Sequence, residues 1–138
     1  MVDSLAYRLY TANTMNKQER HMNYSVDDIR VILQKAQARA QARSEQEYQR
    51  AGNTDHVGAC GFAWVDITQF EGKPIKGNTR VGKMLKQAGI AQNWNRQFSQ
   101  WCNWYGGQSI DIKEAGAEEF AKVLEAYGFT ARVGSRLD

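Results

Sequence analysis

The chain has 138 residues, of which 42% are hydrophobic and 24% are charged, and its formal net charge is +3. This length suits one domain with a core of its own, and the moderate charge and single proline argue against wholesale disorder. The small positive excess is too weak by itself to imply a nucleic-acid partner.

The cysteines and the apolar runs indicate in which compartment the protein is expected to act. Cys60 and Cys102 stand far apart and form no CxxC motif, so a disulfide framework is not expected and both thiols are predicted to be free and buried. No apolar run approaches the ~20 residues of a membrane helix, and the first ten residues lack the order of a signal peptide. We therefore expect a cytoplasmic protein that does not span a membrane.

The first predicted element is a long helix. Residues 1–24 carry no clear period and are expected to form an arm at best. Ser25 followed by Asp28 resembles a capping box, and an apolar stripe then runs to Ala40. An alanine- and glutamine-rich run continues the helix to Arg50, before Gly52. Because its second half has only alanines and Tyr48 to bury, two alternatives stay open: a solvated helix end, or packing on a partner or a second copy.

Residues 59–67 form the most apolar run and predict a central strand covered on both faces. A polar, glycine-containing loop follows at 71–79. Thr79 is expected to cap a short helix that continues through Ala88 and ends at Gly89.

The rest of the chain continues the alternation of helix and strand. Segments 98–105 and 108–112 have a strand character, Asp111 is expected to open a helix that Gly128 ends, and 129–133 alternates as a strand does. The pattern predicts an α/β (α+β) fold: a two-layer sandwich with a three- or four-stranded mixed sheet, two packed helices and the long N-terminal helix. We divide the chain into an arm and long amphipathic helix (1–56) and a compact core domain (57–138).

One match to a nucleotide-binding motif is attributed to chance. Gly77 to Lys83 fits G-x-x-x-x-G-K, but Met84 stands where a phosphate loop needs Ser or Thr, and no buried strand precedes it. His21, His56 and the two cysteines have neither catalytic nor metal-ligand spacing. The sequence therefore predicts no catalytic residue, no metal and no cofactor.

The clearest regional signal is a basic, aromatic segment at 73–105. No Asp or Glu occurs between residues 72 and 110, whereas lysines, arginines and tryptophans are frequent. Such a segment can hold a phosphate backbone and stack bases, or can form a protein-binding hot spot. The alternative is that Trp101 and Trp104 belong to the core and that the lysines are merely solvated.

Two further places carry polar groups of interest. Asp66 stands near the end of the apolar strand, where it is either an exposed strand end or part of a site. Arg132, Ser135, Arg136 and Asp138 follow the last strand, which raises the prospect that the C-terminus is pinned and contributes to a site.

Several segments together resemble a family of small bacteriophage proteins. They are residues 57–65 (VGACGFAWV), 105–109 (YGGQS), the helix start at Lys113 and the ending 134–138 (GSRLD). Those proteins carry a Cys-Gly-Phe-Ala-Trp-Val strand and end in Ser-Arg-(Leu or Met)-Asp. The resemblance covers 57–138 and not the first 56 residues. It implies phage origin and work inside the infected cell, implies no particular reaction, and highlights Cys60, Trp64, Ser135, Arg136 and Asp138.

The leading hypothesis is a non-enzymatic phage accessory protein, an anti-defence or host-takeover factor. It would occupy a host macromolecule or sequester an anionic, nucleotide-type ligand. The alternatives are a nucleic-acid-binding module that uses 73–105 and a small hydrolase or nuclease built on Asp66, Arg136 and Asp138. The residues predicted to bind a ligand or partner are Trp64, Asp66, Arg80, Lys83, Lys86, Arg96, Trp101, Trp104, Tyr105, Arg132, Ser135, Arg136 and Asp138.

Overall fold

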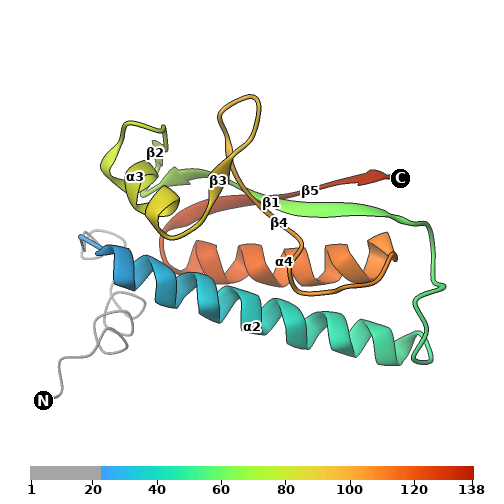
Figure 1. Cartoon of the computed structure of the whole chain (residues 1–138). Helices are drawn as coiled ribbons and strands as arrows, with labels where there is room; N and C mark the ends of the chain where they lie inside the picture. The colour runs from blue at the N-terminus through green and yellow to red at the C-terminus, as the bar shows by residue number, and fades with distance from the viewer. Residues whose placement is uncertain (1–22) are drawn as a thin grey trace, which may run out of the picture.

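A computed structural model describes residues 23–138, and the expected arm lies almost wholly outside that range (Figure 1). The described elements, in chain order, are α2 (Val26–Arg50), β1 (Gly61–Phe70), β2 (Lys73–Pro74), α3 (Arg80–Gln87), β3 (Ala91–Gln92), β4 (Phe98–Trp101), α4 (Ile110–Ala126) and β5 (Phe129–Leu137).

Each of the three helices in the described part of the chain begins at a side-chain cap. Ser25 and Asp28 form the expected capping box at α2, and the Thr79 hydroxyl accepts a hydrogen bond from the Gly82 N–H at α3. Helix α4 begins one residue before the predicted Asp111, because Ser109 caps it by accepting from the Ile112 N–H. The prediction of a strand at 108–112 is therefore wrong, because this segment contains the cap and the first turn of α4.

The sheet is built around β1. Strand β5 pairs with one edge of β1 and β4 with the other. The short strand β2 pairs with the end of β1, and β3 pairs with β4. The two-layer α+β fold is confirmed. The sheet has five strands rather than three or four, and it is antiparallel rather than mixed, since both neighbours of β1 run opposite to it.

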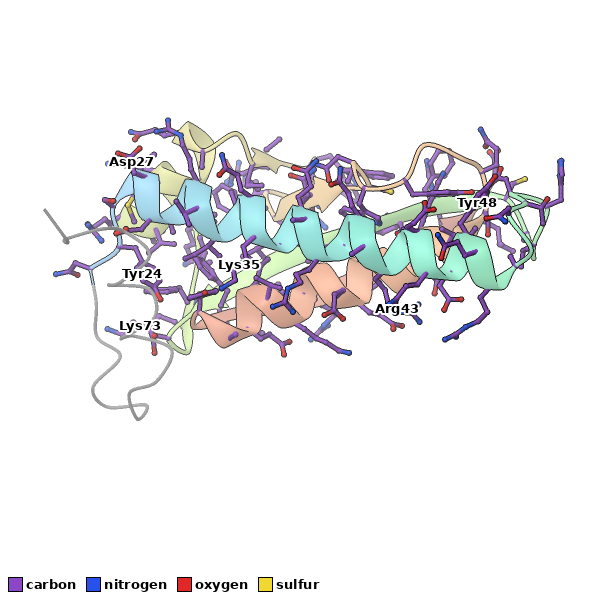
Figure 2. The ribbon with its side chains drawn as sticks, turned by 90° about the horizontal axis from the view of Figure 1, so that it is seen from below. Tyr24, Asp27, Lys35, Arg43, Tyr48 and Lys73 are labelled. Atoms are coloured by element: carbon purple, nitrogen blue, oxygen red, sulfur yellow. The ribbon has the colours of Figure 1, made fainter. Side chains whose placement is uncertain are left out.

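Among residues 23–138, helices cover only one face of this sheet. Helices α2 and α4 lie side by side across it, and α3 lies at the end near β2 and β3 (Figures 1 and 2). Along β1 burial alternates: Ala63, Val65 and Ile67 are buried, whereas Phe62 and Trp64 are half-buried. The expectation that β1 is covered on both faces is therefore wrong. We call the uncovered side the open face. Its aromatic side chains are half-buried because they pack against one another.

The second half of α2 packs on α4 of the same chain. Ala40 is fully buried, the Ser44 hydroxyl donates to the Ile112 carbonyl at 3.2 Å, and the Tyr48 ring lies 6.3 Å from that of Tyr105. This half of the helix is therefore not simply a solvated end, and packing on a partner or a second copy stays a prediction.

The last strand is longer than its sequence pattern suggested. Strand β5 continues past 133 to Leu137 and pairs with β1 along its whole length, so the C-terminal residues are pinned. In contrast, β4 ends at Trp101 instead of continuing to 105.

Both cysteines are free, but Cys60 is exposed rather than buried. Cys102 is half-buried, and burial raises the pKa of its thiol. Among the described residues, no helix combines the length and the apolar character needed to cross a membrane.

Candidate ligand-binding face

A stack of aromatic rings forms the centre of the open face. Trp64 on β1 and Trp101 on β4 are direct cross-strand partners, and their ring centroids lie 4.8 Å apart at 32°. Phe62 meets the edge of Trp101 at 6.1 Å. Trp101 remains 46% exposed, so one side of this stack faces solvent.

Gly134 makes room for that stack. It pairs with Trp64 across the β1–β5 ladder, and a Cβ added there would lie 2.3 Å from Trp64 Nε1. The indole can lie over β5 only because this position has no side chain. The glycine of the C-terminal Gly-Ser-Arg-Leu-Asp ending thus serves the aromatic face.

Asp66 lies beside the stack, in the middle of β1 rather than at its end. Its Oδ1 accepts a hydrogen bond from the Ser99 hydroxyl at 2.5 Å, and its Oδ2 accepts one from Trp64 Nε1 at 3.3 Å. One donor on each oxygen holds the half-buried carboxylate in a defined orientation.

The turn between β3 and β4 forms a wall above the face (Figure 1). The Asn93 side-chain oxygen accepts from the N–H groups of Asn95 and Gln97, and its amide donates to the Ser99 hydroxyl. Trp94, at this turn, is 93% exposed. Wall and sheet enclose a hollow of about 390 Å³, whose lining includes Asp66, Trp94 and Trp101.

Two arginines of β5 bring positive charge to the same face. Arg136 pairs in register with Phe62, carries its guanidinium 5.2 Å from the centre of that ring, and lines the hollow. Arg132 pairs in register with Asp66. Within residues 23–138, neither arginine has a carboxylate within 4.0 Å, so both cations are available to an incoming anion.

Four predicted site residues therefore meet around one hollow, namely Trp64, Asp66, Trp101 and Arg136. Two others of the C-terminal set do not join them. Ser135 pairs with buried Ala63 and thus belongs to the opposite side of the sheet, and the Asp138 N–H donates to the Cys60 carbonyl at the strand end. Asp138 stands six residues beyond Arg132, roughly 20 Å along the strand, which separates it from Asp66.

Trp104 and Tyr105 lie outside the aromatic hollow and make structural contacts. Trp104 is 5% exposed, packs on Phe120 and donates from Nε1 to the Lys113 carbonyl. The Tyr105 hydroxyl donates to Asp55, and burial together with this carboxylate raises the pKa of the phenol. The Trp104 ring is therefore buried, while half-buried Tyr105 has its hydroxyl already bonded and its binding role stays a prediction.

The basic residues of 73–105 do not form one continuous patch. Arg80 donates to the Tyr24 carbonyl at 2.8 Å, Lys83 points to solvent from α3, and Lys86 donates to the Gly77 carbonyl at 3.3 Å. Lys76 and Arg96 line a second hollow of about 640 Å³. Asn95 lines both this hollow and the aromatic one.

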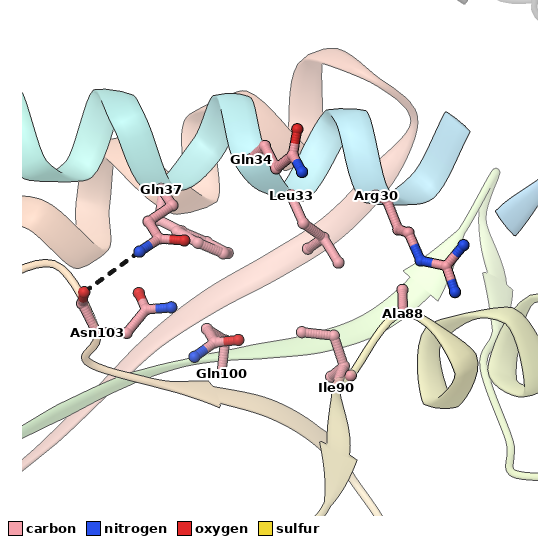
Figure 3. Close-up of a pocket in the computed structure, with 10 residues that line it drawn as sticks. Arg30, Leu33, Gln34, Gln37, Ala88, Ile90, Gln100 and Asn103 are labelled. Carbon is pink, nitrogen blue, oxygen red and sulfur yellow. Dashed lines mark hydrogen bonds between the residues drawn. The ribbon is translucent and has the colours of Figure 1, made fainter. Parts of the chain in front are cut away.

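A third hollow, of about 440 Å³, lies between α2 and the β3–β4 edge (Figure 3). Amides dominate its rim, and Gln37 donates to the Asn103 carbonyl across it. Its one charged residue, Arg30, is already paired with Asp27 at 3.0 Å. With no available charge and no exposed ring, it is a weaker ligand site than the open face.

Sequence reasoning missed several parts of the site. Phe62 and Trp94 stood out as aromatic residues but were not selected, and Ser99 and Asn93 carried no signal at all. Their roles follow from the pairing of β1 with β4, which brings together residues about 35 positions apart. Within residues 23–138, no group of three or more His, Cys, Asp or Glu side chains is placed to hold a metal ion.

Comparisons of this chain with protein-family models, with curated proteins and with solved structures found no match.

Proposed function

We propose that this chain is a non-enzymatic binding protein that holds an anionic, nucleotide-type ligand on the open face of its sheet. The observation that carries the proposal is the hollow in which exposed tryptophans, a fixed carboxylate and an unpaired arginine converge. Its volume of about 390 Å³ lies within the range of small-molecule sites.

The aromatic part of the hollow suits a planar ring. Bases stack on aromatic side chains, and each stacked base contributes about 1–3 kcal/mol to binding. Trp101 offers a half-exposed face on the floor and Trp94 an exposed indole on the wall. In the free protein both side chains expose apolar surface to water, and a stacked ligand would cover that surface.

The charged part of the hollow suits a phosphate. A guanidinium forms strong, paired hydrogen bonds with phosphate oxygens. Arg136 lines the hollow, and Arg132 lies on the same outward face of β5. A ligand that combines a ring with a phosphate would use both features at once.

The resemblance to a phage family supports a setting for this binding. We propose a phage accessory factor that acts in the cytoplasm of the infected host. It would counter a host defence, or redirect host machinery, by withdrawing a nucleotide signal from solution. Occupation of a host protein or other macromolecule through the same face is the competing outcome.

The direct test is titration of the full chain with the five nucleoside 5′-monophosphates and the matching nucleosides. Binding is followed by tryptophan fluorescence and by calorimetry. We expect at least one nucleotide to bind, and its nucleoside to bind more weakly because it lacks the phosphate. Trp101→Ala and Arg136→Ala should each weaken binding about tenfold.

Arg39→Ala is the matched control, because Arg39 is an exposed arginine of α2 on the other side of the molecule. It should leave affinity unchanged. If no nucleotide binds, or if Trp101→Ala leaves the affinity intact, the proposal is wrong. Capture of a host protein by the same face in the absence of nucleotide binding would establish the competing outcome.

A second candidate, a single-stranded nucleic-acid module, is favoured by the basic hollow next to the aromatic one. Lys76 and Arg96 line it, and Asn95 joins the two. A chain of several nucleotides could place a base in one hollow and a phosphate in the other. This candidate requires oligonucleotides to bind more tightly than mononucleotides, with an affinity that falls steeply with salt.

A further inference from the structure

The hollow also contains a carboxylate, and neither base stacking nor phosphate binding gives it a role. A nucleotide is an anion, and a negative group in its site opposes binding unless it accepts hydrogen bonds from the ligand. Asp66 is such a group, since it lines the hollow beside Trp101. Its position therefore carries information about which ligand fits.

The two hydrogen bonds of Asp66 leave acceptor capacity on both carboxylate oxygens. An ionised carboxylate has about four lone-pair sites. The Ser99 hydroxyl uses one on Oδ1, and Trp64 Nε1 uses one on Oδ2. Each oxygen can thus accept one more hydrogen bond, and both are already held in orientation.

Among the common bases, only guanine presents two adjacent N–H donors on its Watson–Crick edge, at N1 and at the 2-amino group. Adenine and cytosine each place a donor beside an acceptor, and uracil places one donor between two carbonyls. An acceptor facing a carboxylate is repelled. A fixed carboxylate next to a stacking surface therefore selects guanine by its edge.

The order of residues along β1 fits a nucleotide whose base edge faces Asp66 and whose phosphate faces Arg136. Phe62, which pairs with Arg136, is followed on the same face by Trp64 and then by Asp66. Phe62 and Asp66 lie four residues apart, roughly 13 Å along the strand. A ring stacked at the centre would thus point its edge toward Asp66 and its phosphate toward Arg136.

We infer that the open face is selective for guanine nucleotides, with Asp66 accepting the N1–H and the 2-amino group. This inference rests on the proposed function and specifies its ligand. Ser99 and Trp64 also act as positioning residues, because their hydrogen bonds orient the Asp66 carboxylate. Sequestration would then be directed at a guanine-containing signal or nucleotide pool.

The test compares GMP with IMP, AMP, CMP and UMP on the full chain. IMP is the sharpest comparison, because it differs from GMP only by the missing 2-amino group. We expect GMP to bind at least about tenfold more tightly than IMP, since a base contact made by two hydrogen bonds discriminates on that scale. Asp66→Asn, which replaces one acceptor by a donor, should abolish that preference.

Asp27→Asn is the matched control, because Asp27 is an exposed carboxylate of α2 far from the face, and it should keep the preference. If Asp66→Asn does not fold, the unaltered chain still decides: equal affinity for GMP and IMP overturns the inference. Equal binding of all nucleotides leaves the proposed function standing and removes the selectivity. Absence of all binding removes both.

Discussion

Asp55 connects two distant parts of the chain through three hydrogen bonds. It accepts from the Tyr105 hydroxyl, from the Gln108 N–H at 2.7 Å and from the Ser109 N–H at 3.1 Å. The linker after α2 is thereby tied to the segment that starts α4. The Tyr105 hydroxyl, followed by the Gln108 N–H, lowers the pKa of Asp55 below its ordinary value of 3.8.

Asp55→Ala should lower the free energy of unfolding at neutral pH by about 1–3 kcal/mol, because it leaves partly buried donors without an acceptor. A carboxyl with a depressed pKa stabilises the folded state above its unfolded pKa, and this contribution is lost as the pH falls through the folded value. The difference between variant and parent in urea denaturation should therefore shrink below pH 3.8.

Tyr105→Phe is the control for this prediction, because it removes only one of the three hydrogen bonds. Its cost should be smaller than that of Asp55→Ala. A difference between Asp55→Ala and the parent that stays constant from neutral pH to about pH 3 would contradict the electrostatic part of the account.

At the scale of elements, Gly116 lies where α4 packs tightly against α2. A Cβ added there would lie 2.3 Å from Trp104 Cδ1 and 2.4 Å from Ser44 Oγ. Both neighbours are held in place, since Ser44 bonds to Ile112 and the Trp104 indole bonds to Lys113. The helix therefore carries a glycine where alanine would have the higher helix propensity.

Gly116→Ala should destabilise the fold by about 1–3 kcal/mol, because overpacking outweighs the gain of about 1 kcal/mol in propensity. Chemical denaturation measures the change. Glu118, exposed on the same helix, supplies the control pair: Glu118→Ala should be more stable than Glu118→Gly. If alanine is also the more stable residue at 116, the close approach does not constrain the helices.

The elements differ in how far the sequence predicts them. Caps such as Ser25 and Thr79 are local signals, and they predicted α2 and α3 well. Strands β2 and β3, with two residues each, are too short to have a period. The one-sided cover of β1 was missed because Phe62 and Trp64, on its open side, are as apolar as its buried residues.

The candidate site shows the same limit. Trp64, Asp66, Trp101 and Arg136 were selected for their chemistry, and the structure brings them together. What the sequence could not supply is the pairing of β1 with β4 and β5, which decides that Trp64 meets Trp101 and that Ser99 holds Asp66. Strand pairing depends on tertiary structure, and no local pattern in this chain encodes it.

At the scale of the whole molecule, core and candidate site lie on opposite faces of the sheet. The buried cluster combines Ile29 and Ile32 of α2 with Phe120 and Leu124 of α4. The aromatic hollow belongs to the face that these helices leave open. Substitutions on the open face can therefore alter binding while the core keeps its packing.

The shared core also determines how the chain can be divided. The sequence suggested a compact unit at 57–138, and in the structure α2 adds to the same core residues that are 0–1% exposed, including Ile29, Ile32 and Ala36. Without α2, Phe120 and Leu124 would lose much of their cover. An α4 that is open to water on one side cannot hold the sheet by itself.

We therefore expect a fragment of residues 57–138 to lack a cooperative thermal transition, measured by circular dichroism under conditions where the full chain has one. The physical reason is the loss of apolar burial, at about 25 cal/mol per Å², against a net stability of only about 5–15 kcal/mol. Adding a separate peptide of residues 23–56 should restore part of the transition, because it returns the buried face of α2. A fragment that melts cooperatively near the midpoint of the full chain would show that α2 is an accessory to the fold and not part of its core.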